Sequence, residues 1–502
     1  MFAFVACLSP AFEQSVSELI EATVPASIRL AKDIRLDEPA TEVEILKRLQ
    51  DIAQLNSVKW RSYIGMGYYN CVTPTAILRN IFENPGWTTA YTPYQAEIAQ
   101  GRLESLLNFQ TMVVELTSLD IANASLLDEG TAAAEAMQMV YRHHREKRSK
   151  FLISNNAHPQ TMAIVRTRAE ALGITLDVFD GAKEVFDGVK PLSEQFDLSE
   201  YCGVLVHYPD TNGNVDNLEA IVREAREKEA IVIAATDLLA LTMVKAPGEY
   251  GPGCDIAIGT AQRFGIPLNY GGPHAAFLAC RAYLTRLIPG RVVGLTKDAH
   301  GNQALRLALQ TREQHIRRDK ATSNICTAQA LLANMSAMFA IYHGPKGLKA
   351  IAEDIHKKTM HLARRIEETG VNRVLTYNPF DTLKIEVPIV KRTRARAEAQ
   401  RINLRYYPDS NYVGISLDET VTDQDIADLL WVLEGEKPEK VVYNQAWTES
   451  SPLVSGPMAR RSPFLVHPLF NKYHSETNLI RYMKKLENKD ISLVHSMIPL
   501  VS

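Results

Sequence analysis

The chain has 502 residues, of which 46% are hydrophobic and 23% are charged. This balance is ordinary for a globular protein with a large core, and it makes a disordered or membrane-embedded chain an unsuitable first hypothesis. Lysine and arginine number 55 against 58 aspartate and glutamate, so the net charge of −3 offers no general attraction to nucleic acid.

The N-terminal region, residues 1–70, is predicted to be a helical arm. Its apolar opening, residues 1–8, is too short to cross a membrane and lacks a basic flank, and Glu13 follows early, so no targeting segment is visible. Apolar residues then recur at spacings of three and four, as in residues 43–49, which is typical of an amphipathic helix. The two glycines of Tyr63-Ile-Gly-Met-Gly-Tyr-Tyr-Asn predict a turn whose backbone conformations disfavour a side chain.

A large α/β domain is predicted for residues 71–335. Helical patterns alternate there with short β-rich runs, namely Phe151-Leu-Ile, Gly203-Val-Leu-Val, Ala230-Ile-Val-Ile-Ala-Ala and Ile256-Ala-Ile. Such alternation favours βαβ units and a mainly parallel sheet. The six cysteines are scattered without a C-x-x-C pair, which is typical of free thiols and gives no indication of a metal site.

The C-terminal part is predicted to hold a smaller α/β domain, residues 336–436, introduced by a long helix that begins near Ala328. Its strands are expected at Thr382-Leu-Lys-Ile-Glu-Val and Tyr412-Val-Gly-Ile-Ser-Leu. Residues 437–502 are interpreted as a linker, rich at first in Pro, Ser and Gly, followed by the start of a truncated second half.

An internal comparison supports the idea of a second half. At an offset of 434 residues, Ser475-Glu-Thr-Asn-Leu-Ile-Arg-Tyr-Met-Lys-Lys-Leu aligns without a gap on Thr41-Glu-Val-Glu-Ile-Leu-Lys-Arg-Leu-Gln-Asp-Ile, and the apolar positions coincide. The alternative is that two unrelated amphipathic helices always align in some register. Both interpretations stay open at this point.

The run Asp128-Glu-Gly-Thr-Ala-Ala-Ala-Glu precedes a predicted helix. Gly130 and Thr131 could present backbone N–H groups and a hydroxyl to a phosphate at the helix N-terminus. An ordinary N-cap, in which Asp128 or Thr131 satisfies the first helical turn, is the competing interpretation.

Two further positions resemble a pyridoxal-phosphate site that has lost its lysine. Asp237 follows a predicted parallel strand, where an aspartate could pair with the pyridinium nitrogen, although a solvated turn aspartate is equally compatible. A Schiff-base lysine is expected 20 to 30 residues later, and Gln262 stands there instead. Because an amide nitrogen does not form an imine, this site is predicted to be degenerate.

Several long motifs resemble glycine decarboxylases, the P-proteins of the glycine cleavage system. They are Ser62-Tyr-Ile-Gly-Met-Gly-Tyr-Tyr-Asn, Tyr91-Thr-Pro-Tyr-Gln, Leu126-Leu-Asp-Glu-Gly-Thr-Ala-Ala-Ala-Glu, Gln262-Arg-Phe-Gly-Ile-Pro-Leu-Asn-Tyr-Gly-Gly-Pro-His and Leu309-Gln-Thr-Arg-Glu-Gln-His. The resemblance implies an α/β pyridoxal-phosphate-dependent transferase fold, aminotransferase-like and of fold type I. It also implies that this chain is the first of two homologous halves, of which the second carries the lysine.

The resemblance further implies cofactor, partners and compartment. Pyridoxal phosphate is expected in the other half, where glycine is decarboxylated and its aminomethyl group passes to the lipoyl arm of H-protein. Tyr68, Tyr69, Tyr91 and Tyr94 are the candidates for side chains that line the neighbouring site, with core packing as the alternative. The expected compartment is the mitochondrial matrix in a eukaryote and the cytoplasm in a bacterium.

The resemblance leaves the role of this particular chain between two classes. It is either an enzyme subunit that needs a lysine-bearing half, within a homo- or hetero-oligomer, or a non-catalytic binding or regulatory fragment that docks on a full-length P-protein or on H-protein. No metal, nucleic acid or membrane is expected as a partner.

Overall fold

The computed structural model describes residues 15–30, 32, 34–56, 59–89, 93, 95–308, 321, 325 and 329–496. Contacts within the chain define two compact units, Met1–Trp60 and Arg61–Ser502. The finer division into arm, large domain, small domain and linker stays a prediction.

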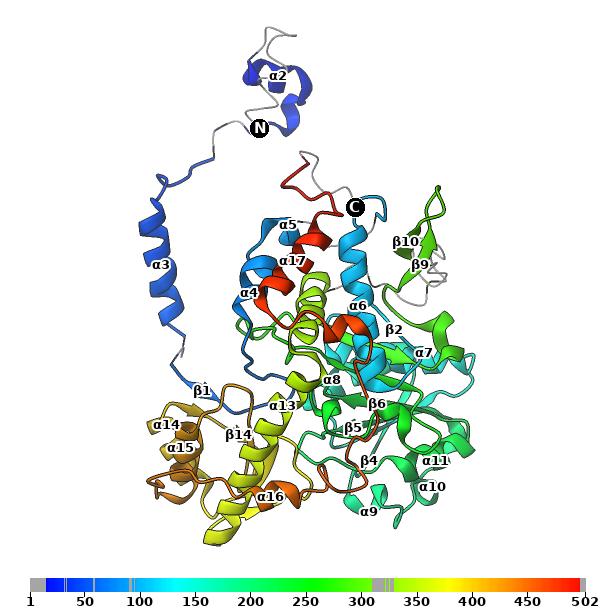
Figure 1. Cartoon of the computed structure of the whole chain (residues 1–502), viewed down its shortest axis with the longest axis vertical. Coiled ribbons are helices and arrows are strands. Elements are labelled where there is room, and N and C mark those ends of the chain that lie inside the picture. The colour runs from blue at the N-terminus through cyan, green and yellow to red at the C-terminus, as the bar shows by residue number, and fades with distance from the viewer. Residues whose placement is uncertain are drawn as a thin grey trace. The chain divides into compact units, whose positions relative to one another are not determined.

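A mainly parallel sheet forms the centre of the second unit, as the alternating pattern predicts (Figure 1). Over the described residues it has seven strands in the order β2-β8-β7-β6-β5-β3-β4. Neighbours from β7 through β6, β5 and β3 to β4 are parallel, whereas β8 is antiparallel to both β7 and β2. The strands are β2 Ile121–Ala122, β3 Lys150–Ser154, β4 Thr175–Phe179, β5 Tyr201–Tyr208, β6 Ile231–Thr236, β7 Ile256–Thr260 and β8 Ala276–Cys280.

The two faces of this sheet bury different side chains, because successive residues of a strand point to opposite sides. In β6, Val232 and Ala234 belong to one buried apolar cluster, while Ile231, Ile233 and Ala235 belong to the other. Burial on both faces explains why the strand is a continuous apolar run rather than an alternating one.

Helices connect and cover the strands of this unit. They are α4 Thr75–Ile77, α5 Pro85–Thr88, α6 Gln100–Thr117, α7 Glu129–His143, α8 Pro159–Leu172, α9 Lys183–Phe186, α10 Leu192–Gln195 and α11 Glu219–Glu227. Short helical turns are η2 Leu78–Phe82, η3 Leu198–Glu200, η4 Ala240–Thr242, η5 Pro247–Glu249 and η6 Ala282–Leu287. A hairpin of β9 Val293–Lys297 and β10 Gln303–Leu307 follows them.

A smaller antiparallel sheet follows the long helix α13, Ala330–Thr369. In the described part of the chain its order is β11-β12-β15-β14, with β11 Arg373–Val374, β12 Thr382–Glu386, β14 Arg405–Tyr406 and β15 Tyr412–Ser416. Helices α14 Val390–Ala399 and α15 Asp423–Glu434 accompany it, and β13 Ile402–Asn403 pairs in parallel with β1 Arg61–Ser62. The predicted strands are therefore confirmed, and so is the long helix, although it was expected to end at Ile341 and continues to Thr369 past the non-helical Gly344.

The remaining elements flank these two sheets in sequence. The first unit contains α2 Val16–Thr23, η1 Ala26–Ile28 and α3 Glu42–Gln54, which confirms its predicted helical character. The C-terminal segment contains α16 Gln445–Glu449, η8 Pro468–Asn471 and α17 Glu476–Glu487. Among the described helices, none has the length and apolar character needed to cross a lipid bilayer.

Candidate functional site

The residues that sequence analysis singled out meet at the carboxyl ends of β5, β6 and β7. Asp237 directly follows β6, and Gln262 and Arg263 lie in the turn after β7. This edge of a parallel sheet is where open α/β folds bind their ligands, because the loops that leave the strands converge there. His207, near the end of β5, faces the same pocket.

The Gln262 side chain hydrogen-bonds to the main chain of two other segments. Its side chain is fully buried, and its amide nitrogen donates to the carbonyl oxygens of Tyr69 at 2.6 Å and Ile266 at 2.7 Å. Its amide oxygen accepts from the backbone N–H of Tyr69 at 3.1 Å. The position where a lysine is expected therefore holds the Tyr69 loop in place and offers no amine.

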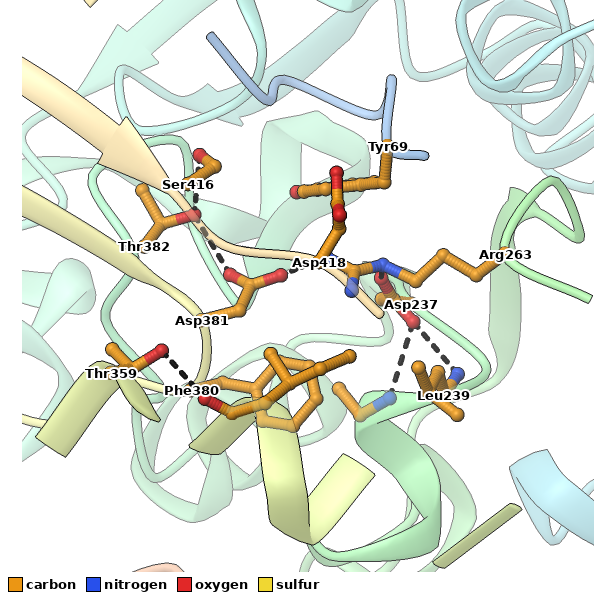
Figure 2. A network of polar contacts seen from close by, with 12 residues as sticks. Tyr69, Asp237, Leu239, Arg263, Thr359, Phe380, Asp381, Thr382, Ser416 and Asp418 are labelled. Atoms are coloured by element: carbon orange, nitrogen blue, oxygen red, sulfur yellow. Dashed lines mark hydrogen bonds and ion pairs between the residues drawn. The ribbon is translucent and has the colours of Figure 1, made fainter. Parts of the chain in front are cut away.

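Arg263 lines the pocket, and its side chain lies among Tyr69, Asp237 and Asp381 (Figure 2). Its guanidinium Nε lies 2.6 Å from a carboxylate oxygen of Asp237, and its terminal nitrogen pairs with Asp381. The guanidinium carbon stands 3.4 Å from the ring centroid of Tyr69, a close cation–π contact. A planar cation of this chain thus lies over an aromatic ring between two carboxylates.

Asp237 has both carboxylate oxygens engaged within this chain. One oxygen accepts from the backbone N–H groups of Leu239 at 2.7 Å and Ala240 at 3.1 Å, and the other pairs with Arg263. In a pyridoxal-phosphate enzyme this aspartate would face the pyridinium nitrogen. Here the positive partner is the arginine side chain.

These residues do not fit pyridoxal phosphate. The space that remains beside Arg263 has a volume of about 20 Å³. A single water molecule needs roughly 10–15 Å³ by a comparable measure, so no pyridine ring with a phosphate can enter without displacing the arginine. The pocket lacks an imine-forming amine at Gln262, and its pyridinium partner is already paired.

Gly130 and Thr131 begin α7, and the helix has an ordinary N-cap. The Asp128 carboxylate accepts from the Thr131 N–H at 2.8 Å, and the Asp128 N–H donates to the Thr131 hydroxyl at 3.2 Å, which makes a capping box. A Cβ on Gly130 would meet the Ile164 side chain at 2.4 Å, so glycine allows α7 and α8 to approach. The carboxylate of Asp128 would also repel a phosphate at this end of the helix.

Glu129, His158 and His207 form a buried cluster on one wall of the pocket. Their potential ligand atoms lie within 4.8 Å of one another, and Thr161 donates to Glu129 at 2.8 Å. Burial raises the pKa of Glu129 to about 7 and lowers the pKa of His207 to about 4. The backbone N–H of His158 donates to Nδ1 of His207 at 3.3 Å. In neutral His207 the proton is then on Nε2, which lies 3.8 Å from a carboxylate oxygen of Glu129.

The four candidate tyrosines lie in two loops. Tyr69 is partly buried, and its ring packs against Arg263 and lines the pocket of this half. Tyr68 is 42% exposed, its ring centroid is 4.8 Å from that of His274, and it borders a separate pocket of about 360 Å³. Tyr91 and Tyr94 lie outside the described residues, so their predicted role is not addressed.

The loop that carries Tyr68 and Tyr69 has an unusual backbone. Gly65, Met66 and Gly67 have φ values of 67°, 59° and 88°, which confirms the predicted glycine-dependent turn. A Cβ on Gly65 would lie 2.0 Å from the Ser416 hydroxyl oxygen, so this loop passes directly against the end of β15.

Sequence analysis missed the residues that close the pocket. Arg263 stands next to Gln262 in the motif but carries no signal of its pairing with Asp381, which is 118 positions away. His158, directly after the loop that follows β3, and His207, within β5, could have been noticed as polar groups at the same sheet edge.

The fold defines the class of protein: it is that of pyridoxal-phosphate-dependent enzymes of fold type I, whose solved decarboxylases and lyases superpose on this chain. The first of these structures is a glycine decarboxylase P-protein of the glycine cleavage system in inhibitor-bound form. It has 32% sequence identity and a TM-score of 0.75, and the match covers 86% of this chain and 97% of that one.

Residues 8–433 match the family described as Glycine cleavage system P-protein, and the chain belongs to that family. The mouse mitochondrial glycine dehydrogenase (decarboxylating) is 55% identical over 97% of this chain and 46% of its own length. The glycine dehydrogenase (decarboxylating) of Thermosynechococcus vestitus is 52% identical over 97% of this chain and 49% of its own length. The chain therefore spans about half the length of the curated relatives it matches.

Proposed function

We propose that this chain is the non-catalytic half of a glycine decarboxylase. It associates with a homologous half that carries the Schiff-base lysine, and glycine decarboxylation with transfer of the aminomethyl group to lipoylated H-protein takes place in that half. The observation that carries the proposal is Arg263, whose guanidinium pairs with Asp381 and with Asp237, the carboxylate that a pyridinium nitrogen would otherwise need.

Tyr68 supports a role at the neighbouring site. Unlike Tyr69, it is half-exposed and borders an open pocket lined by Ile64, Met66 and Leu268. A tyrosine that combines an apolar ring with a polar hydroxyl suits a surface that becomes buried against a partner. In this proposal the Tyr68 pocket faces the lysine-bearing half, and Tyr91 and Tyr94 contribute from the second loop.

Family membership supports the proposed cofactor, partners and compartment. Pyridoxal phosphate is bound by the lysine-bearing half, and glycine and H-protein are the substrate and the acceptor. The relatives include a mitochondrial protein of mouse and a protein of the bacterium Thermosynechococcus vestitus. The proposed compartment is accordingly the mitochondrial matrix in a eukaryote and the cytoplasm in a bacterium.

The test is cofactor binding and activity, alone and in complex. The purified chain is mixed with pyridoxal phosphate, freed of excess, reduced with borohydride and examined for absorbance and for a labelled lysine. We expect no retained cofactor on the chain alone. Coexpressed with a lysine-bearing half, it should form a complex with one cofactor per pair of halves that releases carbon dioxide from glycine in the presence of H-protein.

Two results would overturn the proposal. Stoichiometric cofactor on a lysine of this chain alone would mean that the Arg263 pocket opens and that this half is catalytic. A stable complex whose activity does not exceed that of the lysine-bearing half alone would instead indicate a binding or regulatory fragment.

A further inference from the structure

Helix α17 occupies a receptor groove on the second unit, which we call the α17 groove. The helix packs against α6, α4, η2 and α13, and in Figure 1 it lies beside α4 and α6, which precede it by hundreds of residues. Leu479, Met483 and Leu486 enter the groove and are 0 to 1% exposed. Burial of three such side chains makes this a packed contact rather than a loose terminus.

Polar contacts fix the register of α17 in its groove. The Asp490 carboxylate accepts from the backbone N–H of Gly101 at 2.6 Å and from Nε of Arg102 at 2.8 Å. It thereby gives a hydrogen-bond partner to a backbone N–H in the first turn of α6. Asn108 donates to the Tyr482 hydroxyl at 2.8 Å. A Cβ on Gly101 would lie 1.9 Å from the carbonyl oxygen of Leu486, so the groove is shaped for this helix.

Helix α3 is the counterpart of α17 at the offset of 434 residues. Thr41 is the N-cap of α3 and Ser475 is the N-cap of α17, and each side chain accepts from the backbone N–H three residues later. The structure therefore starts the two helices at the positions that the sequence alignment pairs. This agreement supports the internal repeat over a chance alignment of amphipathic helices.

The apolar residues of α3 are exposed where those of α17 are buried. Ile45, Leu49 and Ile52 correspond to Leu479, Met483 and Leu486, and they are 40%, 54% and 52% exposed. No residue of the described α3 is buried. A helix with an apolar face of this kind is normally covered by a partner.

The polar residues of α3 differ from those that anchor α17. Arg48 stands where α17 has Tyr482, Ala53 where it has Glu487, and Asn56 where the following turn has Asp490. Asp490 forms an ion pair with Arg102, whereas Asn56 is neutral and could not form one with an arginine at the equivalent position. The apolar spacing thus fits a groove of the α17 type, but the polar residues do not match the groove of this half.

We infer that α3 docks in the corresponding groove of the homologous lysine-bearing half, so that the two halves exchange their leading helices. Helix α17 is the first helix of the second repeat, and it packs on the first repeat. If the two halves are related by a two-fold axis, the first helix of the first repeat, α3, packs on the second repeat in the same way. The inference rests on the proposed function, because it requires a homologous lysine-bearing half whose groove receives α3.

The test uses the full chain coexpressed with a lysine-bearing half, for which the unmatched remainder of the mouse relative serves as the probe. Leu49→Glu together with Ile52→Glu should weaken the complex about a hundredfold or more, because two acidic groups would enter an apolar groove. The matched control is Gln54→Glu on the opposite face of α3, which should leave the dissociation constant unchanged.

A photo-reactive residue in place of Leu46, at the rim of the apolar face, locates the groove. We expect its cross-links on the segment of the lysine-bearing half that aligns with Gln100–Thr117. Cross-links to this chain's own groove or to a second copy, or an unchanged affinity of the double variant, would overturn the inference while leaving the proposed function intact. Failure of the unsubstituted halves to associate would overturn both.

Discussion

Gln262 and Arg263 are neighbours in sequence but have different partners. Gln262 binds both the backbone N–H and the carbonyl oxygen of Tyr69, whereas Arg263 pairs with the buried Asp381 and the partly buried Asp237. Without a pyridinium ring, Asp237 would have no cation beside it if Arg263 were absent, and a partly buried carboxylate without a cation is destabilising. Arg263 supplies that cation from within the chain.

Glu129 gives a pH dependence at the scale of one residue. Burial raises its pKa from about 4.5 to about 7. Between these values folding takes up a proton, so the folded state loses stability as pH rises from 4.5 towards 7. Glu129→Gln keeps an oxygen for Thr161 and removes the charge. We expect the variant to be more stable than the original by about 1–3 kcal/mol at pH 8 and equal to it at pH 4.

Urea unfolding at the two pH values measures this difference, with Glu436→Gln at an exposed position as the control. Equal stabilities of the Glu129 variant and the original protein at pH 8 would show that the carboxylate is already charged in the folded state without penalty.

At the scale of elements, helix α17 illustrates how a repeat can be recognised. Its amphipathic spacing predicted a helix, and the offset of 434 aligned its N-cap Ser475 with Thr41, the N-cap of α3. What it packs against was not predictable, because the receptor residues on α4 and α6 lie hundreds of positions earlier. The apolar periodicity of a helix indicates that one of its faces packs against a partner. Only the polar contacts, such as those of Asp490 and Tyr482, identify the surface on which it packs.

Gly101 tests the close approach of α6 and α17. In a helix interior alanine is normally favoured over glycine by about 1 kcal/mol. Here a Cβ would collide with the backbone carbonyl of Leu486, which cannot move without displacing α17. We therefore expect Gly101→Ala to lower the free energy of unfolding by about 2 kcal/mol despite its better helix propensity.

The control for that substitution is Gly294→Ala in β9, where a Cβ would meet nothing within 4 Å. Chemical denaturation should separate the two variants. If Gly101→Ala stabilised the protein, the contact between α6 and α17 would be looser than the structure has it.

At the scale of the whole molecule, the Arg263 cluster joins the two sheets. Asp237 follows β6 of the large sheet, and Asp381 precedes β12 of the small sheet. The guanidinium between them ties the orientation of one sheet to that of the other. Phe380 adds to this contact, since its ring centroid lies 5.8 Å from the guanidinium carbon.

Asp381→Asn tests this connection. The amide leaves Arg263 with Asp237 alone, and we expect a loss of about 2 kcal/mol in the free energy of unfolding. Native-state hydrogen exchange should become faster at the amides of β12 and β15, while that of α8 stays unchanged.

Asp409→Asn, at an exposed turn between β14 and β15, is the control for that experiment. Uniformly faster exchange throughout both sheets would contradict a local link and would indicate a global loss of stability instead.

The sequence by itself determined the α/β class, the parallel strands and the family, because periodicity and long contiguous motifs are local properties. Only the tertiary structure decided that Arg263 pairs with Asp237 and Asp381 and that Asp128 caps α7. The same holds for Tyr69, which lies within this half while Tyr68 is half-exposed. These facts depend on residues such as Asp237, Asp381 and Ser416, which the fold brings together across long separations. The charged partner of a side chain depends on which strand ends lie close together in the fold. The sequence next to that side chain therefore does not predict the partner.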